Sequence, residues 1–211
     1  MISKLRVNYD LAQLEEKDLL DDPILMFEEW LNFAISKKVR EPNMMVLATC
    51  GKDRQPSARA VLLKGLDKGF VFYTNYESNK AREMKENDKV GLTFNWLPLH
   101  KQVRIEGTVK KYSQKKSTEY FQSRPKGSQI GAWASPQSRL ITRDLLEKNV
   151  EELNHKFKKE KVLPKPSHWG GYIVRPQRIE FWQGRPSRLH DRLVYEKPKG
   201  KRKWLISRLA P

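Results

Sequence analysis

The part of the sequence that most constrains the fold is a series of short apolar segments between residues 44 and 112. Polar turns such as GKDRQP separate them. Segments of this length that are rich in Val, Ile, Phe and Thr and bounded by turn residues are typical of β-strands. Because the connections are short, we expect a meander of mostly antiparallel strands. The predicted strands are residues 44–50, 57–64, 69–75, 89–96 and 102–112.

Helices interrupt and follow this meander. Asp22-Pro23 supplies an N-cap followed by proline at the first helical position, and it predicts a helix over 23–38. A shorter helix is predicted to begin near Ser78. The segment 125–139 has no periodicity, and we expect it to be an irregular loop of functional interest. Two more helices are predicted at 113–124 and 139–160, followed by strands at 171–176, 178–183, 187–196 and 203–209, the last two joined by a hairpin turn at 197–202.

Sequential strands with a few inserted helices predict an α+β protein built on a small antiparallel barrel. The chain of 211 residues, 38% of them hydrophobic, is long enough for one sizeable core, and no internal repeat or low-complexity linker divides it. We therefore expect one domain over residues 1–211, with residues 1–20 as a flexible N-terminal segment.

The composition excludes several classes of protein. No run of about 18 apolar residues is present, and the first residues lack the apolar stretch of a signal peptide. Cys50 is the only cysteine, so neither an internal disulfide nor a thiolate metal cluster can form. The four histidines lack metal-ligand spacing, and no HExxH, GxSxG, P-loop or GxGxxG motif occurs. We expect a soluble, cytoplasmic protein without a membrane association or a metal site.

The chain is strongly basic, with a formal net charge of +17. Such a surface attracts polyanions, so nucleic acid is one candidate partner. The local clusters at 156–161 and 197–203 are, however, more often solvated faces than binding stripes. Small phosphorylated ligands also require cations, and composition alone leaves both kinds of ligand open.

The segment RAVLLK carries the first candidate anion-binding pair, Arg59 and Lys64. In one extended strand these residues lie about 16 Å apart at ~3.3 Å per residue, and alternation points them to opposite faces. If both bind anions, two anionic sites are predicted, unless a bulge realigns the strand. The alternative is an ordinary strand with charged ends.

A second candidate follows in YTNYESNK, which runs from a strand into a helix start. Free backbone N–H groups and the helix dipole favour anions there, and Thr74, Ser78 and Lys80 could complete a phosphate site. In the alternative interpretation Ser78 is a simple N-cap and Lys80 a surface residue.

The segment EYFQSRPKGS provides a third candidate. Tyr120 and Arg124 share a helical face, and the turn at Pro125 and Gly127 could bring Ser128 to the same point. Such a trio would form a second phosphate pocket. The alternative is surface packing of a Tyr/Arg pair.

The last candidate lies in FWQGRPSRLHDR. If this segment is a strand, then Arg188, His190 and Arg192 face one side of it, close to Trp182. Two guanidinium groups and an imidazole could stack on a planar ring and donate hydrogen bonds to its heteroatoms. A paired Asp191 or a solvated edge strand explains the same pattern.

These motifs occur in a fixed order over nearly the whole chain. RAVLLK, FYTN followed by S-x-K, KQVRIEG, YFxSRPxxSQIGAWxSxQS, WGGY, IEFWQGxxxRLHDR and a terminal RLAP together resemble the pyridoxamine 5′-phosphate oxidase family. The resemblance implies an FMN-binding split β-barrel, antiparallel and Greek-key-like, with peripheral helices. It also implies a homodimer with FMN at the subunit interface.

The activity implied by the resemblance is the oxidation of pyridoxamine 5′-phosphate and pyridoxine 5′-phosphate to pyridoxal 5′-phosphate. Oxygen accepts the electrons and becomes hydrogen peroxide, and the amine also yields ammonia. This reaction is the final step of pyridoxal phosphate biosynthesis and salvage. Both cofactor and substrate are phosphate esters, which agrees with the inference of two anionic sites.

The resemblance also implies roles for single residues. Arg188 and His190 would hold the pyridine ring as the catalytic pair, and the N-terminal stretch from Arg6 to Tyr9 would cover the site. The implied substrate-binding residues are Lys64, Tyr120, Arg124, Ser128, Arg188, His190, Arg6 and Tyr9. The implied FMN-binding residues are Arg59, Ala60, Val61, Leu62, Leu63, Lys64, Tyr73, Thr74, Lys80, Gln102, Gln137, Ser138, Trp182 and Arg192.

One position departs from the family pattern. Many relatives read Ser-Arg-Lys where this chain reads Ser78-Asn79-Lys80, so an amide stands where a guanidinium is expected at the FMN phosphate. A hydrogen bond to a charged group contributes about 1.5–3 kcal/mol, so this position bears on how tightly FMN binds and not on its identity.

Two alternatives to the oxidase stay open at the level of the sequence. One is a non-catalytic split-barrel protein that binds a flavin or pyridoxal phosphate, and the other is a basic nucleic-acid-binding protein. The presence of all the implied substrate-side residues favours the oxidase over the first alternative.

Overall fold

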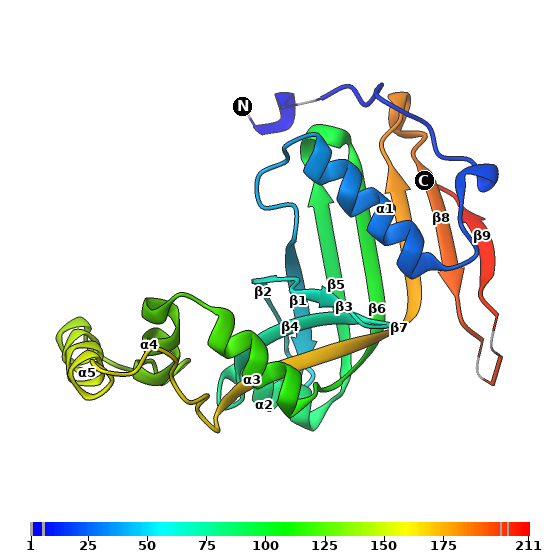
Figure 1. The fold of residues 1–211 in the computed structure, drawn as a ribbon. Helices are drawn as coiled ribbons and strands as arrows, with labels where there is room; N and C mark the ends of the chain where they lie inside the picture. Colours follow the sequence, from blue (N-terminus) through cyan, green and yellow to red (C-terminus); the bar gives the residue numbers. More distant parts are fainter. Residues whose placement is uncertain (1, 6, 199, 202) are drawn as a thin grey trace.

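One antiparallel sheet organises the described part of this computed structural model, which comprises residues 2–5, 7–198, 200–201 and 203–211. Its strands follow the order β2-β1-β5-β6-β7-β4-β3, and β8 and β9 branch from β7 (Figure 1). The strands are Met44–Cys50 (β1), Pro56–Leu62 (β2), Gly65–Leu66 (β3), Phe70–Asn75 (β4), Lys89–Trp96 (β5), Lys101–Lys111 (β6), Trp169–Gln183 (β7), Asp191–Glu196 (β8) and Leu205–Leu209 (β9). The prediction of an antiparallel α+β protein is confirmed.

The helices lie at two places on this sheet. Figure 1 shows α1 lying across the strands, whereas α3, α4 and α5 gather beside the first half of β7. None of the described helices is long and apolar enough to cross a membrane. The α-helices are Pro23–Ser36 (α1), Asn79–Glu86 (α2), Gln114–Ser123 (α3), Lys126–Ala134 (α4) and Arg143–Lys156 (α5).

The strand β7 belongs to both branches of the sheet. It pairs with β6 on one side, and on the other side it pairs first with β4 and then with β8. The change of partner occurs around Pro176, opposite a bulge between Glu106 and Gly107. A Cβ at Gly107 would lie 2.2 Å from the carbonyl oxygen of Arg175, so only glycine allows this close approach. The prediction of two separate strands at 171–176 and 178–183 is therefore wrong.

The helix α1 covers one end of the barrel. The carboxylate of Asp22 accepts a hydrogen bond of 2.8 Å from the Ile24 N–H, as the predicted N-cap requires. Helical spacing then buries Phe27 completely, with its ring 4.9 Å from that of Phe70 and 4.7 Å from that of Phe94. These aromatic contacts form the centre of the main core.

A second, smaller core holds α3, α4 and α5 against the start of β7. Its buried members are Phe121, Ile130, Phe157, Leu163 and Trp169. The expectation of an irregular loop over 125–139 is wrong, because α4 occupies most of it. The helix is stabilised by packing in this cluster, whose members come from distant parts of the chain, and local periodicity does not reveal it.

The N-terminal segment contacts the C-terminal strands. The N–H of buried Leu14 donates to the carboxylate of Asp191 at 3.0 Å, and Arg208 donates to the Leu14 carbonyl at 3.0 Å and to Glu16 at 2.9 Å. Arg6, one of the residues expected to cover the site, lies outside the described residues.

Candidate functional site

The end of β4 and the start of α2 bring together the predicted trio Thr74, Ser78 and Lys80. The Lys80 Nζ lies 3.4 Å from Thr74 Oγ1 and 3.5 Å from Ser78 Oγ. The Lys80 side chain is buried, and burial together with the charge of Arg59 lowers its pKa. Ser78 is the N-cap residue of α2, but its hydroxyl donates to the Asn75 carbonyl and makes no cap hydrogen bond, so only the position of Ser78 in the alternative interpretation is confirmed, and its surface placement of Lys80 is wrong. We call this trio, which the sequence predicts to bind a phosphate, the phosphate cradle.

The loop after α4 reaches the same place. Thr74 Oγ1 donates to the Gln137 side-chain oxygen at 3.2 Å, and the Asn79 N–H donates to Ser138 Oγ at 3.2 Å. Ser138 adopts a left-handed φ of 70°. These contacts place two further predicted FMN residues, Gln137 and Ser138, at the end of β4 and the start of α2.

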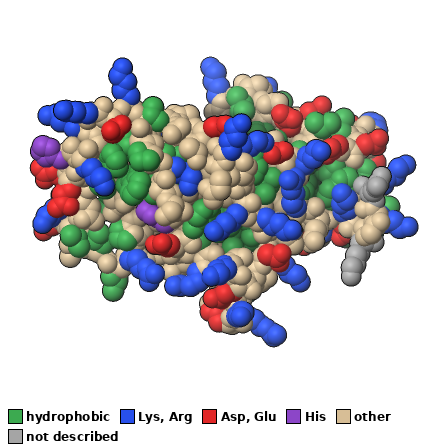
Figure 2. Space-filling model, turned by 60° about the horizontal axis from the view of Figure 1, so that its bottom comes forward, with side chains coloured by type: hydrophobic (Ala, Val, Ile, Leu, Met, Phe, Trp, Pro, Cys, Tyr) green, Lys and Arg blue, Asp and Glu red, His purple; other side chains and the backbone are tan. Residues whose placement is uncertain are grey.

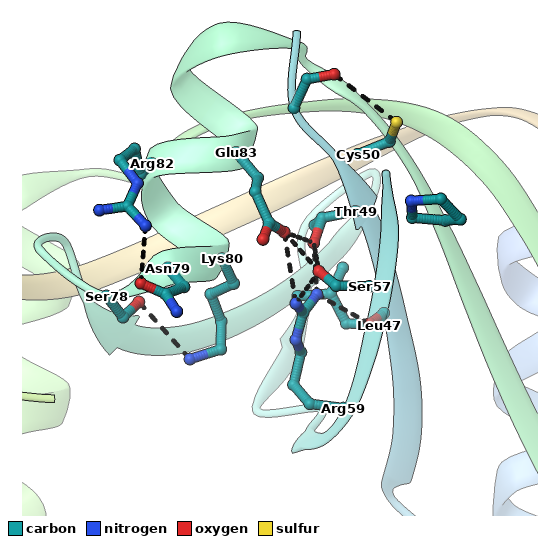
Figure 3. A network of polar contacts seen from close by, with 12 residues as sticks. Leu47, Thr49, Cys50, Ser57, Arg59, Ser78, Asn79, Lys80, Arg82 and Glu83 are labelled. Carbon is teal, nitrogen blue, oxygen red and sulfur yellow. Dashed lines mark hydrogen bonds and ion pairs between the residues drawn. The ribbon is translucent and has the colours of Figure 1, made fainter. Parts of the chain in front are cut away.

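Asn79, the position that departs from the family pattern, is hydrogen-bonded to an arginine on the same helix. The Asn79 side-chain oxygen accepts a hydrogen bond of 2.8 Å from Arg82 Nη2 (Figure 3). A guanidinium therefore stands one helical turn from the position where the family pattern places one.

A cavity of about 650 Å³ opens beside the phosphate cradle. It is lined by nine of the fourteen predicted FMN residues and by Lys64, Tyr120, Arg124 and Ser128, which are the four residues predicted to hold the substrate phosphate. The nine FMN residues are Arg59, Ala60, Val61, Leu62, Lys64, Tyr73, Thr74, Lys80 and Gln137. Leu63 instead points into the core and is buried.

The expected separation of Arg59 and Lys64 on opposite faces of one strand is wrong. The strand β2 ends at Leu62, and the Lys64 N–H donates to the Val71 carbonyl at 2.8 Å. The alternation therefore stops before Lys64, and both side chains line the same cavity.

The wall of the cavity carries an aromatic stack and a free cationic group. The rings of Tyr73 and Tyr120 stack at 4.1 Å, and Tyr73 stacks on Trp169 at 5.4 Å. Burial raises the pKa of Tyr73 to about 12. The Arg124 guanidinium lies 4.8 Å from the Trp169 ring, and its buried Nη1 has no hydrogen-bond partner among the described residues. A guanidinium nitrogen that is buried beside a cavity without a partner is consistent with the predicted anion site.

A second group of predicted residues lies at the other end of β7. Gln102, Trp182 and Arg192 occupy one row across β6, β7 and β8. Arg192 donates to the buried carboxylate of Glu180 at 2.9 Å, which fixes its guanidinium. We call this row, with His190 and Tyr9 beside it, the distal cluster.

Tyr9 and His190 pack on Trp182. The Tyr9 ring meets the rings of Trp182 and His190 edge-on, at 5.7 and 5.4 Å. The imidazole Nδ1 of His190 accepts a hydrogen bond of 3.1 Å from the Arg185 N–H, so in the neutral ring the proton is on Nε2. Burial and the charge of Arg188 lower the pKa of His190, and both favour this neutral form. A second cavity of about 420 Å³ adjoins Tyr9, Arg188 and His190.

The predicted row of Arg188, His190 and Arg192 on one strand does not exist. Arg188 lies in a 3₁₀ turn, with a left-handed φ of 62°, and β8 begins only at Asp191. The preceding Gly and Pro residues turn the chain before the strand starts. The Asp191 carboxylate accepts from Arg208 at 2.8 Å, as the alternative interpretation expected.

The phosphate cradle and the distal cluster are far apart within one chain. Tyr73 pairs with Gly171 of β7, whereas Gln102 pairs with Trp182. The difference of eleven residues (182 minus 171) corresponds to about 36 Å along the strand at ~3.3 Å per residue, less the bend visible in Figure 1. One chain therefore presents the predicted residues as two separate groups.

The prediction from sequence missed two acidic residues that hold the arginines of these groups. Glu83 contacts Arg59, and Glu180 contacts Arg192. Glu83 follows Lys80 by three residues on α2, so helical spacing would have placed both on one side of the helix.

Two family models match the chain. Residues 31–157 match the model described as pyridoxamine 5′-phosphate oxidase, and residues 169–211 match the pyridoxine 5′-phosphate oxidase C-terminal dimerisation region. The second match contains β7, β8 and β9 and therefore most of the distal cluster.

Curated relatives are similar over their whole length. The pyridoxine/pyridoxamine 5′-phosphate oxidase of Salinibacter ruber is 51% identical over 212 residues, and that of Aliarcobacter butzleri is 54% identical over 213 residues. Each alignment covers 100% of this chain and 99% of the relative.

Solved structures share the fold. PhzG from Burkholderia lata, solved with tetrahydrophenazine-1-carboxylic acid, superposes with a TM-score of 0.89 at 29% identity, covering 97% of this chain and 100% of that one. An FMN-binding, oxidase-related protein from Nostoc punctiforme gives 0.70 at 14% identity, covering 88% and 97%, and supports the fold alone. The predicted split barrel is confirmed, and with the family models and the full-length relatives it shows that the chain belongs to the pyridoxamine 5′-phosphate oxidase family.

Proposed function

We propose that this protein is an FMN-dependent pyridoxine/pyridoxamine 5′-phosphate oxidase that produces pyridoxal 5′-phosphate. The observation that carries the proposal is the convergence of Lys64, Tyr120, Arg124 and Ser128 with nine predicted FMN residues on one cavity. The names of the full-length relatives support the same activity. A location in the reducing cytoplasm, consistent with the single cysteine, is part of the proposal.

The residues around the cavity fit the phosphate of FMN. A phosphate ester requires cations and N–H donors, and Lys80 is a buried cation whose contacts in the phosphate cradle are neutral hydroxyls. The cradle also lies at the N-terminus of α2, where the helix dipole favours negative charge. When bound, FMN supplies the two-electron oxidation and passes the electrons to oxygen.

The protein's own part in the reaction is then to bind and orient the substrate. Lys64, Arg124 and Ser128 would hold its phosphate, and the unpartnered Nη1 of Arg124 is the donor best suited to an oxyanion. The neutral His190 would donate through its Nε2–H to an acceptor atom of the pyridine ring. Such positioning supplies much of the rate acceleration in a reaction whose redox chemistry belongs to the cofactor.

We propose that the complete site forms between two copies of the chain. The phosphate cradle of one copy would meet the distal cluster of the other, since the two groups lie at opposite ends of β7 within one chain. The outward faces of β1 and β2 expose Met44, Val46 and Leu62, which are apolar side chains that an interface would cover. The match of residues 169–211 to a dimerisation region supports the same arrangement.

The charge of the protein gives less support to nucleic-acid binding. Figure 2 shows Lys and Arg side chains spread over the face it presents, with acidic side chains between them, and not gathered into one stripe. A groove that follows a nucleic-acid backbone requires a continuous basic path.

The visible spectrum of the purified protein tests the proposal. We expect flavin absorption bands that bleach when pyridoxamine 5′-phosphate is added without oxygen and return when air is admitted. A yellow protein that does not bleach would indicate a binding protein without oxidase activity. A colourless protein that cannot be loaded with FMN and binds RNA in a salt-dependent way would contradict the proposal outright.

A variant separates substrate binding from cofactor binding. Arg188→Ala should retain FMN while its turnover falls, because Arg188 is proposed to contact the substrate and not the flavin. Normal turnover in this variant would remove Arg188 from the site.

A further inference from the structure

The guanidinium of Arg59 belongs to a closed ring of hydrogen bonds that ties α2 to the β1–β2 hairpin (Figure 3). Arg59 Nη1 donates to Thr49 Oγ1, and Nη2 donates to Ser57 Oγ. Both hydroxyls in turn donate to the same carboxylate oxygen, Glu83 Oε2, which lies 2.6 Å from Ser57 Oγ. Arg59 Nη2 also pairs with this oxygen directly at 3.3 Å.

The ring holds the Arg59 guanidinium in place by giving each of its Nη hydrogens an acceptor. Nη1 makes a second bond of 3.2 Å to the Leu47 carbonyl, so all four Nη hydrogens have partners. Only the Nε–H makes no hydrogen bond to the described residues. A guanidinium held in this way has one orientation, and it loses little conformational freedom when a ligand arrives.

The ring lies beside the phosphate cradle. Glu83 and Lys80 are three residues apart on α2, and the charges of both Arg59 and Glu83 act on Lys80. Arg59 and Glu83 are about one-fifth exposed, so their pairing is only partly screened by water. Burial opposes the charge on Glu83, but the bonds from Ser57 and Thr49 and the charge of Arg59 outweigh it and lower the pKa of Glu83.

We propose that Glu83 is a positioning residue for the FMN phosphate, acting by fixing the guanidinium of Arg59 against α2. This inference rests on the proposed function. Glu83 does not touch the ligand in this arrangement; its carboxylate anchors an arginine that lines the cavity.

The direction in which the Kd of FMN changes when Glu83 is removed distinguishes a positioning role from simple charge repulsion. A carboxylate near an anion site would weaken phosphate binding by charge alone, so its removal would tighten FMN binding. If Glu83 instead positions Arg59, its removal must weaken FMN binding. We expect Glu83→Ala to raise the Kd of FMN about tenfold, which corresponds to about 1.4 kcal/mol.

A conservative variant separates geometry from charge. Only Oε2 of Glu83 accepts bonds in the ring, so the amide oxygen of Glu83→Gln can take its place. We expect Glu83→Gln to bind FMN as tightly as the native protein or more tightly, because the acceptor remains and the negative charge is gone. Weakening in Glu83→Gln equal to that in Glu83→Ala would overturn the proposal.

The experiment measures quenching of FMN fluorescence by the apoprotein of the native chain and each variant, with circular dichroism to verify folding. Glu86→Ala is the matched control, since it removes the same charge from the same helix but contacts the Lys52 N–H and not Arg59. Its Kd should stay within about twofold of native.

The Arg59→Ala background tests whether Glu83 acts through Arg59. We expect the weakening caused by Glu83→Ala to disappear there, leaving at most the tightening due to the lost charge, whereas an equal weakening in both backgrounds would overturn the proposal. If the native protein binds no FMN, the proposed function fails and this inference fails with it. If the native chain and Arg59→Ala bind FMN equally, the cofactor assignment survives and only the positioning role is overturned.

Discussion

A site shared between two chains makes a strong prediction about mixed dimers. Consider Arg124→Ala, which damages the cavity beside the phosphate cradle, and Arg188→Ala, which damages the region of the distal cluster. Each homodimer contains two sites, and each site lacks one guanidinium. Loss of a hydrogen bond to a charged group costs about 1.5–3 kcal/mol, so we expect kcat/KM to fall about 10- to 100-fold in both homodimers.

The heterodimer of these two variants behaves differently if the site is shared. One of its two sites receives native residues from both chains, and the other site lacks both arginines. We therefore expect about half of the native activity per dimer. The two groups are about 36 Å apart measured along the bent strand β7 at ~3.3 Å per residue, so we do not expect both arginines of one chain to contact the same substrate.

The assay uses two affinity tags, one on each variant, and tandem purification of the doubly tagged dimer. Hydrogen peroxide formation from pyridoxamine 5′-phosphate reports the activity. The matched control is the heterodimer of Arg124→Ala with Lys64→Ala, in which both substitutions line the same cavity and each site retains one defect. A heterodimer of Arg124→Ala and Arg188→Ala that is no more active than its parents would refute the shared site.

Three further predictions concern stability and reactivity. Phe27→Ala should lower the free energy of unfolding in urea by about 3–5 kcal/mol, because the ring is fully buried, while exposed Phe33→Ala should change it little. Burial of Glu180 opposes its charge, but the hydrogen bond from Arg192 and the charges of the surrounding arginines outweigh burial and lower its pKa. The ionised carboxylate therefore stabilises the fold above the unfolded-chain pKa of about 4.3, and this stabilisation is lost as the pH falls through the pKa of the folded state. Glu180→Gln should flatten this acid-side loss in unfolding measured from neutral to acid pH; an unchanged slope would contradict the assignment. Burial lowers the pKa of Lys101, whose Nζ lies 3.7 Å from the Trp30 ring, to about 8. Near pH 8 more of its amine is neutral, so limited acetylation followed by peptide mass spectrometry should modify Lys101 ahead of exposed Lys85. Equal rates at the two lysines would count against the lowered pKa.

Local sequence signals predicted those elements whose stability is decided locally. The start of α1 was predicted from Asp22 and Pro23 because the cap and the proline both act within one helical turn. The continuity of β7 was missed because Pro176 normally ends a strand, and only the absence of a side chain at Gly107 on the neighbouring strand accommodates it. The helix α4 was missed for a similar reason, since the core cluster that contains Ile130 is completed by Phe157, Leu163 and Trp169, which come later in the chain.

Local sequence signals likewise predicted one part of the candidate site and missed another. The phosphate cradle was predictable because Thr74, Ser78 and Lys80 lie within seven positions across a strand end and a helix start. Alternation failed for Arg188, whose left-handed backbone follows from a Gly/Pro turn that period-two reasoning ignores. The separation of the two groups of residues depends on pairing between distant strands, and no spacing along the chain encodes it.

The place where Tyr9 rests has a practical consequence. Its ring occupies the space that a side chain at position 184 would fill, since a Cβ on Gly184 would lie 2.6 Å from Tyr9 Cδ1. The methyl group of a Gly184→Ala variant would therefore displace the Tyr9 ring, which packs against His190, and expose the imidazole. The opposite end of the chain lies just as near, since Arg192 Nη1 donates to the Ala210 carbonyl at 2.9 Å, so a fusion partner at either end should be removed before kinetic work.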